Sequence, residues 1–213
     1  KAPSTDLFKG FGDPILKGAA GQLRGLKISE FYAGNDVKLE TLRRLSELPE
    51  TSQELRDISN YLGAAEEEVF LRNRATEANV KNQDLSNTKI IAFATHGLVG
   101  GELDGLAEPA LVLTPPVRST KKDDGLLTAS EISDLKLNAD WVLLSACNTA
   151  SGQTLEAEGL SGLARAFIYA GARSLLVSHW DVESDAAAAL TTRTFAALEK
   201  NPSIGRAKAL QIS

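Results

Sequence analysis

The chain has 213 residues, of which 43% are hydrophobic and 24% charged, which is ample material for the core of a globular domain. Its net charge is −5 and its lysines and arginines form no concentrated cluster, which argues against nucleic acid as a direct partner. Its apolar runs are far shorter than a membrane span and its single cysteine cannot form an internal disulfide, so we expect a cytoplasmic protein that does not enter the membrane.

The chain begins with a predicted strand and a predicted helix. The sequence GFGDPIL at 10–16 is typical of a short first strand after a turn. Apolar residues recur between 42 and 62, but Pro49 interrupts them. We therefore predict the helix over 51–61, with Gly63 ending it.

The next elements continue the alternation of strands and helices. EEVFLRN at 67–73 is a second strand candidate, and ATEANVKN at 75–82 predicts a short helix capped by Thr76. KIIAFAT at 89–95 is a continuous apolar strand, the kind that is buried on both faces of a parallel sheet.

The C-terminal part repeats this pattern. WVLLSA at 141–146 and ARSLLVS at 172–178 are two more strands of the buried kind. Between them we predict a helix over 159–170 that Gly171 ends, and another helix follows at 184–198. Alternating strands and helices imply an α/β fold, with a mostly parallel central sheet covered by helices on both faces.

One segment breaks the alternation. Residues 97–140 form a long insertion between two core strands, and within it PALVLTPP at 109–116 and DGLLTASEI at 124–132 are expected to pair as a hairpin. Long loops at the carboxyl ends of parallel strands are where α/β proteins bind ligands.

Two reactive side chains follow predicted core strands. His96 comes directly after the strand at 89–95 and is followed by Gly97, whereas Cys147 comes directly after the strand at 141–146. If these strands are neighbours, both side chains face one crevice at the functional edge of the sheet. The imidazole can then take the thiol proton, and the N–H groups of Gly97 and Cys147 can form an oxyanion hole.

Other interpretations of these residues stay open at this point. A single cysteine is most often a small buried residue, and a histidine after a strand is most often structural. His179 is a rival base because it also ends a strand, although the neighbouring Trp180 and the lack of a following glycine favour a structural position. Two histidines and one cysteine show no metal-ligand spacing, and no phosphate-binding loop is present, so we expect neither a metal nor a cofactor.

Several motifs in order resemble those of a CHAT domain, a caspase-like cysteine peptidase domain that in bacteria is often fused to tetratricopeptide-type helical repeats. The resemblance runs from about Gly10 to the C-terminus. Its motifs are FATHG (93–97), EPALVLTP (108–115), DGLLTASEI (124–132), LLSACNT (143–149) and GLARAFIYAGARSLLVSHWDV (162–182). It implies a single domain over 1–213 with a caspase–hemoglobinase fold, as a fragment of a longer chain, and a His/Cys dyad that falls on His96 and Cys147.

We therefore expect a cysteine endopeptidase that hydrolyses peptide bonds through a thioester acyl-enzyme, with His96 as general base. Its partners would be a protein or peptide substrate and a regulatory partner or helical-repeat module outside this fragment. Two alternatives stay open. One is a caspase-like scaffold that binds a protein partner and cleaves little or nothing, and the other is a redox-sensing thiol.

The loops near the predicted nucleophile also suggest a specificity. Glu156 and Glu158 follow Cys147, and Asp181 follows the strand at 172–178, whereas neither loop carries an arginine. A pocket for Arg or Lys needs an acid, so we expect a basic residue before the scissile bond, with Asp181 as its main contact. Ser145 stands two residues before the cysteine and would form part of the pocket wall.

Overall fold

The computed structural model describes residues 6–18, 25–27, 32–33, 36–37, 39–99, 108–120, 122–145, 156–178 and 183–213. Its strands are β1 (Asp6–Pro14), β2 (Gly25–Lys27), β3 (Tyr32–Ala33), β4 (Asp36–Val37), β5 (Val69–Arg72), β6 (Thr88–Ala94), β7 (Gly97–Val99), β8 (Ala110–Val112), β9 (Leu126–Thr128), β10 (Trp141–Leu144) and β11 (Leu175–Val177). Its α-helices are α1 (Leu39–Arg43), α2 (Glu50–Leu62), α3 (Glu77–Asn82), α4 (Ala129–Asp134), α5 (Glu156–Ala170), α6 (Ser184–Lys200) and α7 (Arg206–Gln211).

The centre of the described structure is a five-stranded sheet in the order β11-β10-β6-β1-β5. Every pair of neighbouring strands in it is parallel. All five carboxyl ends therefore lie at one edge of the sheet. This arrangement confirms the α/β fold with a parallel central sheet that the alternating sequence predicts.

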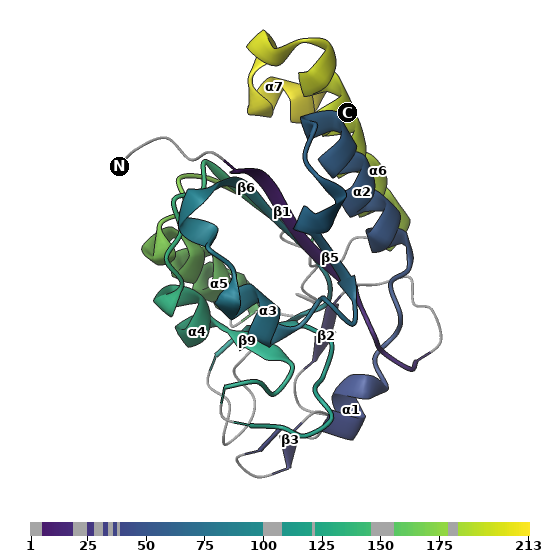
Figure 1. Cartoon of the computed structure of the whole chain (residues 1–213), viewed down its shortest axis with the longest axis vertical. Coiled ribbons are helices and arrows are strands. Elements are labelled where there is room, and N and C mark those ends of the chain that lie inside the picture. Colours follow the sequence, from purple (N-terminus) through teal and green to yellow (C-terminus); the bar gives the residue numbers. More distant parts are fainter. Residues whose placement is uncertain are drawn as a thin grey trace.

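Helices cover both faces of the sheet (Figure 1). On one face, α2 and α6 pack over a core that includes Phe8, Leu55 and Phe195. On the other face, α3, α4 and α5 enclose a second core in which Phe11, Phe93 and neighbouring aromatic rings stack. Successive residues of β1 point to opposite faces, so this strand supplies both cores.

Most element boundaries follow the local signals in the sequence. Gly63 ends α2 in the left-handed conformation, with φ 64°, and Thr76 caps α3 by accepting a hydrogen bond from the N–H of Asn79. The first strand was predicted too late, because β1 begins at Asp6 rather than at residue 10. Its early part is held by pairing with β6, which starts at Asp6 opposite Thr88.

The last strand of the sheet differs from the prediction. β11 is apolar, yet Leu175, Leu176 and Val177 are all half-buried rather than buried. β11 is one edge strand of the described five-stranded sheet, but β5 at the other edge is mostly buried, so edge position alone does not set the exposure. An apolar run therefore predicted the strand correctly but not its exposure.

The insertion forms part of a second sheet, in the order β2-β7-β8-β9. β8 and β9 pair antiparallel, from Ala110 opposite Thr128 to Val112 opposite Leu126, which confirms the predicted hairpin. The second arm was predicted too long, because residues 129–134 form α4. Thr128 and Glu131 make a capping box there, and this local signal starts the helix.

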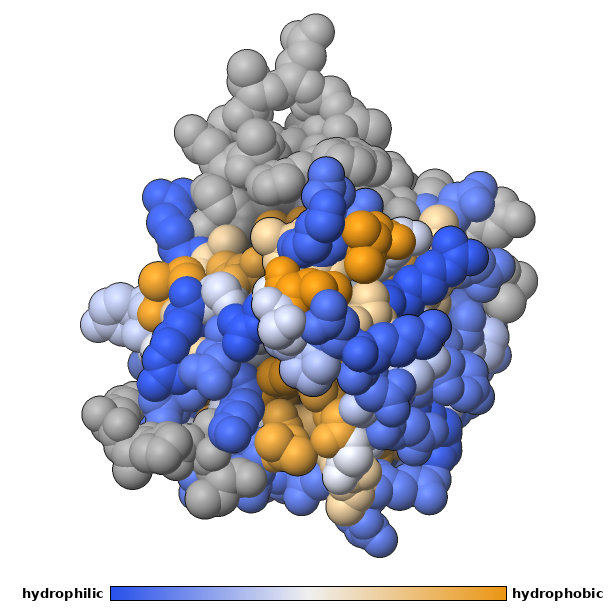
Figure 2. Space-filling view, turned by 90° about the horizontal axis from the view of Figure 1, so that it is seen from above, coloured by the Kyte–Doolittle hydropathy of each residue, from blue (hydrophilic) through white to orange (hydrophobic). Residues whose placement is uncertain are grey.

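None of the described helices is long and apolar enough to cross a bilayer. Seen from the end at which α7 lies, most of the described surface is hydrophilic (Figure 2). Hydrophobic side chains gather there in a few separate patches.

Candidate active site

His96 lies at the carboxyl edge of the central sheet, two residues after the end of β6. Its side chain is fully buried. The backbone around it is tied to the hairpin, because Val112 N–H donates to the carbonyl of His96 over 2.9 Å and the hydroxyl of Thr95 donates to the carbonyl of Val112. The imidazole therefore sits on a rigid junction between the two sheets.

The strand that precedes Cys147 is the neighbour of the strand that precedes His96. β6 and β10 are paired in parallel from Ile90 opposite Trp141 to Phe93 opposite Leu144. Each of these pairs is separated by 51 positions (141 − 90 and 144 − 93), and His96 and Cys147 are separated by the same number (147 − 96). The two strands are thus neighbours, which is the condition under which His96 and Cys147 are expected to face one crevice.

The His96 ring is oriented by a main-chain carbonyl. Its Nε2 atom lies 2.8 Å from the carbonyl oxygen of Ser46. A carbonyl oxygen only accepts hydrogen bonds, so the geometry assigns the proton to Nε2. In the neutral ring Nδ1 then carries the lone pair and is the basic nitrogen.

The turn that carries Ser46 is held against the end of β1. Gly18 and Ser46 form an isolated parallel bridge, and Gly18 N–H donates to the carbonyl of Leu45 over 2.9 Å. A Cβ at Gly18 would collide with the carbonyl oxygens of Arg44 and Leu45, so only glycine fits this approach. Nothing in the local sequence signals this role of Ser46, because the contact joins the His96 side chain to a main-chain carbonyl 50 positions away.

The structure places the other predicted site residues as follows. Gly97 begins β7, in register with Gly25 of β2 and Leu111 of β8. Ser145 directly follows β10 and is buried. Glu156 and Glu158 lie in the first turn of α5.

Three residues of the sequence-based prediction, Cys147, His179 and Asp181, lie outside the described residues. Their roles therefore stay predictions. For the proposed dyad, the structure describes the surroundings of His96 and the strand that leads to Cys147.

A cluster of charged groups joins α3 to the hairpin and to α4. The Glu77 carboxylate is buried, accepts hydrogen bonds from the N–H groups of Asp124 and Gly125 over 2.8 and 3.0 Å, and pairs with Lys81. Lys81 also pairs with Glu131 over 2.7 Å. Burial is the main cause that raises the pKa of Glu77 to about 7. The cluster fixes the hairpin at the start of β9, where Leu126 is paired with Val112.

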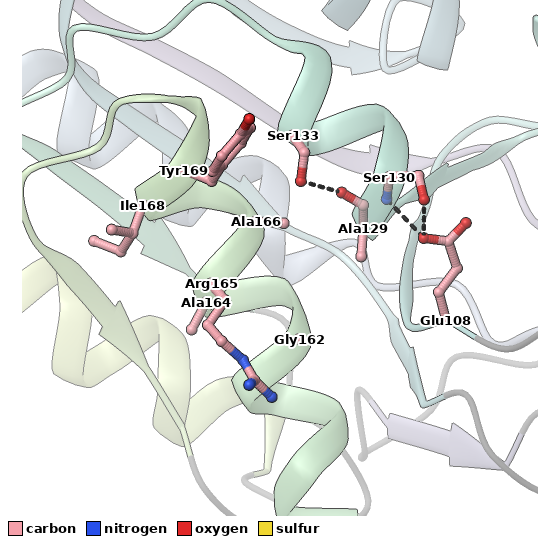
Figure 3. A pocket seen from close by; sticks show the side chains of 10 residues that line it. All are labelled: Glu108, Ala129, Ser130, Ser133, Gly162, Ala164, Arg165, Ala166, Ile168 and Tyr169. Carbon is pink, nitrogen blue, oxygen red and sulfur yellow. Dashed lines mark hydrogen bonds between the residues drawn. The ribbon is translucent and has the colours of Figure 1, made fainter.

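A groove of about 740 Å³ lies between α4 and α5 (Figure 3). The side chains of Ile168 and Tyr169 on α5 are exposed, and Glu108 at the other wall accepts hydrogen bonds from the N–H and hydroxyl of Ser130. Neither His96 nor Ser145 lines this groove. Among the described residues, the groove thus does not include the histidine of the candidate active site.

Metal-ligating side chains do not converge in the part of the chain that the structure describes. Within those ranges no three His, Cys, Asp or Glu side chains are placed so that they could hold a metal ion.

Comparison with known proteins gives two findings. The family model of the CHAT domain matches residues 15–212. Tetratricopeptide repeat protein 28 of Mus musculus is 43% identical over 68 residues, which are 32% of this chain and 2% of that protein. The chain thus spans a very small part of the length of this relative.

Proposed function

This chain belongs to the CHAT domain family, which is related to the caspase-like cysteine peptidases, and we propose that it is a cysteine endopeptidase whose catalytic dyad is His96 and Cys147. The observation that carries the proposal is the register of β6 and β10. It makes neighbours of the two parallel strands that lead to His96 and Cys147, and their carboxyl ends lie at the edge where α/β proteins place their reactive groups, which supports the dyad.

The protonation of His96 supports the role of general base. Because Nε2 donates to the Ser46 carbonyl, Nδ1 is the nitrogen that accepts a proton. Transfer of the thiol proton of Cys147 to Nδ1 leaves a thiolate and an imidazolium, and the thiolate is the reactive nucleophile. The carbonyl of Ser46 stays a hydrogen-bond acceptor throughout, so it also stabilises the imidazolium.

The reaction proceeds in two stages. The thiolate attacks the carbonyl carbon of the scissile peptide, and N–H groups of Gly97 and Cys147 bind the oxyanion that forms. The carbon–nitrogen bond breaks as the imidazolium gives its proton to the leaving amine, which leaves a thioester. Water, deprotonated by His96, then hydrolyses the thioester and restores the thiol. No metal or cofactor takes part in these steps.

The substrate preference is proposed on charge. Asp181, Glu156 and Glu158 are the acids proposed for the pocket, with Ser145, directly after β10, as part of its wall, so a substrate Arg or Lys before the scissile bond is expected. A peptide library varied at that one position tests this preference. Cleavage after Asp or after small apolar residues, with Arg and Lys ignored, would contradict it.

The partners and the compartment are proposed on indirect grounds. The match to a tetratricopeptide repeat protein supports a helical-repeat module or regulatory protein as partner. We place the reaction in the cytoplasm because the nucleophile must stay a reduced thiol.

The test is incubation of the protein with a proteome, followed by mapping of the new protein termini. Wild-type protein should generate termini that the Cys147→Ala variant does not. Identical sets of termini from the two proteins would reject the peptidase and favour a caspase-like scaffold that binds a partner without cleaving it.

A further inference from the structure

Two residues with unusual backbone conformations meet beside the candidate active site. Asp13 and Arg72 have positive φ angles of 45° and 53°, and both lie at the carboxyl ends of their strands, β1 and β5. A positive φ is unfavourable for a residue with a Cβ atom and persists only where surrounding contacts hold it. These two strands are neighbours in the sheet, so the two conformations belong to one local structure.

The contacts that hold this structure are charged. The guanidinium of Arg72 donates to Asp13 Oδ1 over 3.0 Å and to Glu47 Oε1 over 3.3 Å. The side chain of Asp13 is only 7% exposed, and its burial raises the pKa of the carboxyl while Arg72 opposes the rise. One guanidinium thus joins two carboxylates from separate segments, the end of β1 and the turn after α1.

The backbone of Arg72 is fixed as well. Its carbonyl accepts a hydrogen bond from the Thr114 hydroxyl over 2.6 Å, and the same hydroxyl oxygen accepts from Ile15 N–H over 2.9 Å. Thr114 follows β8, so the hairpin also takes part in holding Arg72. The backbone position from which the Arg72 side chain extends is therefore well determined.

The turn reached by Arg72 is the one that orients His96. Glu47 is the residue next to Ser46, whose carbonyl lies 2.8 Å from His96 Nε2. The same turn has one more link to the end of β1, because the Thr51 hydroxyl accepts from Asp13 N–H and donates to the carbonyl of Leu48.

We propose that Arg72 is a positioning residue for the histidine of the dyad. By clamping Glu47 to Asp13 it fixes the Ser46 carbonyl, and that carbonyl fixes the tautomer and the orientation of the His96 ring. Arg72 itself does not touch the substrate. The consequence for catalysis rests on the proposed peptidase function, whereas the consequence for the tautomer of His96 does not.

The first measurement is the ring ¹⁵N NMR spectrum of His96, which reports which nitrogen carries the proton. The chain has two histidines, so the His179→Asn variant leaves a single ring to assign. In that background the neutral ring of His96 should be protonated at Nε2. Arg72→Met should produce a mixture of tautomers, and Glu47→Gln, which leaves the Arg72–Asp13 pair intact, should shift the spectrum in the same direction.

The second measurement is catalysis. Arg72→Met should lower kcat by about 10- to 100-fold, while KM changes by less than about threefold, because a misplaced base slows chemistry more than binding. The pH profile of Cys147 alkylation should move upward by about one unit, since the imidazole stabilises the thiolate less well. Arg72→Lys keeps the charge but not the forked geometry, so it should recover part of the loss.

A matched control is available on the same sheet. Arg173 pairs with Asp140 over 2.5 Å and has a side-chain exposure of 51%, close to the 43% of Arg72, but it precedes β11 at the opposite edge. Arg173→Met should leave kcat, the alkylation profile and the tautomer unchanged. If thermal melting shows that Arg72→Met does not fold, the same measurements on Glu47→Gln and Arg72→Lys test the proposal instead.

The outcomes separate the two proposals. An unchanged tautomer and an unchanged alkylation profile in Arg72→Met and Glu47→Gln would overturn the role of Arg72, even with full peptidase activity in the wild type. A shifted tautomer in a wild-type protein that cleaves nothing would support the role of Arg72 and reject the peptidase. Equal losses in Arg72→Met and Arg173→Met would also overturn the positioning role, because they would reflect general destabilisation.

Discussion

At the scale of single residues, His96 is the group on which the proposed chemistry depends. It is buried, its backbone is bonded to β8 and its Nε2 is held by Ser46. Burial at a junction of two sheets keeps the ring in one orientation, which a general base requires. The same burial means that a replacement has to fit the cavity of the imidazole, so asparagine is the more suitable substitution.

We predict that His96→Asn lowers the rate of acylation by about 10²- to 10⁴-fold, the usual effect of losing a general base. His179→Asn, the matched control, should retain activity at unchanged melting temperature. In alkylation experiments with iodoacetamide, wild-type Cys147 should react well below the ordinary thiol pKa of about 8.5, and His96→Ala should shift the reaction to higher pH. Loss of turnover in a folded His179→Asn variant would assign the base to the other histidine.

Glu77 supports a prediction on the pH dependence of stability. Its pKa rises from 4.5 in the unfolded chain to about 7 in the fold, so the folded state binds the proton more tightly. The contribution of Glu77 is fully present below pH 4.5 and is lost as the pH rises through 7. Around the carboxylate lie Lys81 of α3, Glu131 of α4 and Asp124 of the hairpin, so above pH 7 three carboxylates share one ammonium group.

The expected result is a free energy of unfolding that falls between pH 5 and pH 7 with a slope of at most about 1 kcal/mol per pH unit from this group. Glu77→Gln should remove that part of the slope, as measured by urea unfolding at a series of pH values. Glu67→Gln, a control at a surface position next to β5, should keep it. The interpretation is wrong if the two variants have the same slope.

At the scale of elements, the packing of α2 against β1 and β6 places the end of β1 beside the site. A Cβ at Gly12 would lie 2.7 Å from both the carbonyl oxygen of Ala94 and the side chain of Leu55. These contacts are too short for a Cβ atom, so either β1 or α2 would have to move. Gly12 and Ala94 are paired in register, two residues before His96.

Gly12→Ala is therefore predicted to destabilise the protein by about 1–3 kcal/mol, as overpacking in a core does, and to lower kcat because β6 shifts near His96. Gly63→Ala is the matched control. Open space surrounds that position, and its cost of about 1–2 kcal/mol comes from its φ of 64° alone. Stability follows from chemical denaturation and kcat from peptide cleavage. Equal kcat values in the two variants would show that the contact at Gly12 does not reach the site.

At the scale of the whole molecule, the sheet is the common wall of two cores, and α6 closes one of them. Phe195 of α6 is buried and packs on Trp141 of β10, with ring centroids 5.3 Å apart. The guanidinium of Arg206, which begins α7, lies over the Trp141 ring, 5.2 Å from its centre. The C-terminal helices are thus attached to the strand that leads to Cys147.

Phe195→Ala should cost about 3–5 kcal/mol, because it leaves a cavity under α6, and should lower the melting temperature by about 6–20 °C for a chain of this size. Leu190→Ala on the same helix is the control, since Leu190 is 42% exposed and should cost less than about 1 kcal/mol. Differential scanning calorimetry measures both. A shift of the same size in the two variants would mean that Phe195 does not anchor the helix.

Short-range features of this protein follow from the sequence. The Thr76 cap, the glycines that end α2 and α5, and the apolar runs of β5, β6, β10 and β11 each depend on a few consecutive residues, and the structure has them where predicted, whereas β1 begins earlier. The sequence also shows that His96 and Cys147 each follow a buried strand, but it gives the pairing of β6 with β10 only as a condition, which the structure meets.

Other features were decided only by the tertiary structure. The two edge strands of the sheet differ in exposure, β11 being half-buried and β5 mostly buried, and their apolar runs do not encode this difference. The carbonyl of Ser46 reaches His96, and Arg72 joins Asp13 to Glu47, because the chain returns to the end of β1 after α1. A main-chain carbonyl has no residue type, and an ion pair between distant segments has no local pattern. The sequence therefore determined which residues could react, whereas the packing of separate segments decided what holds His96 in place.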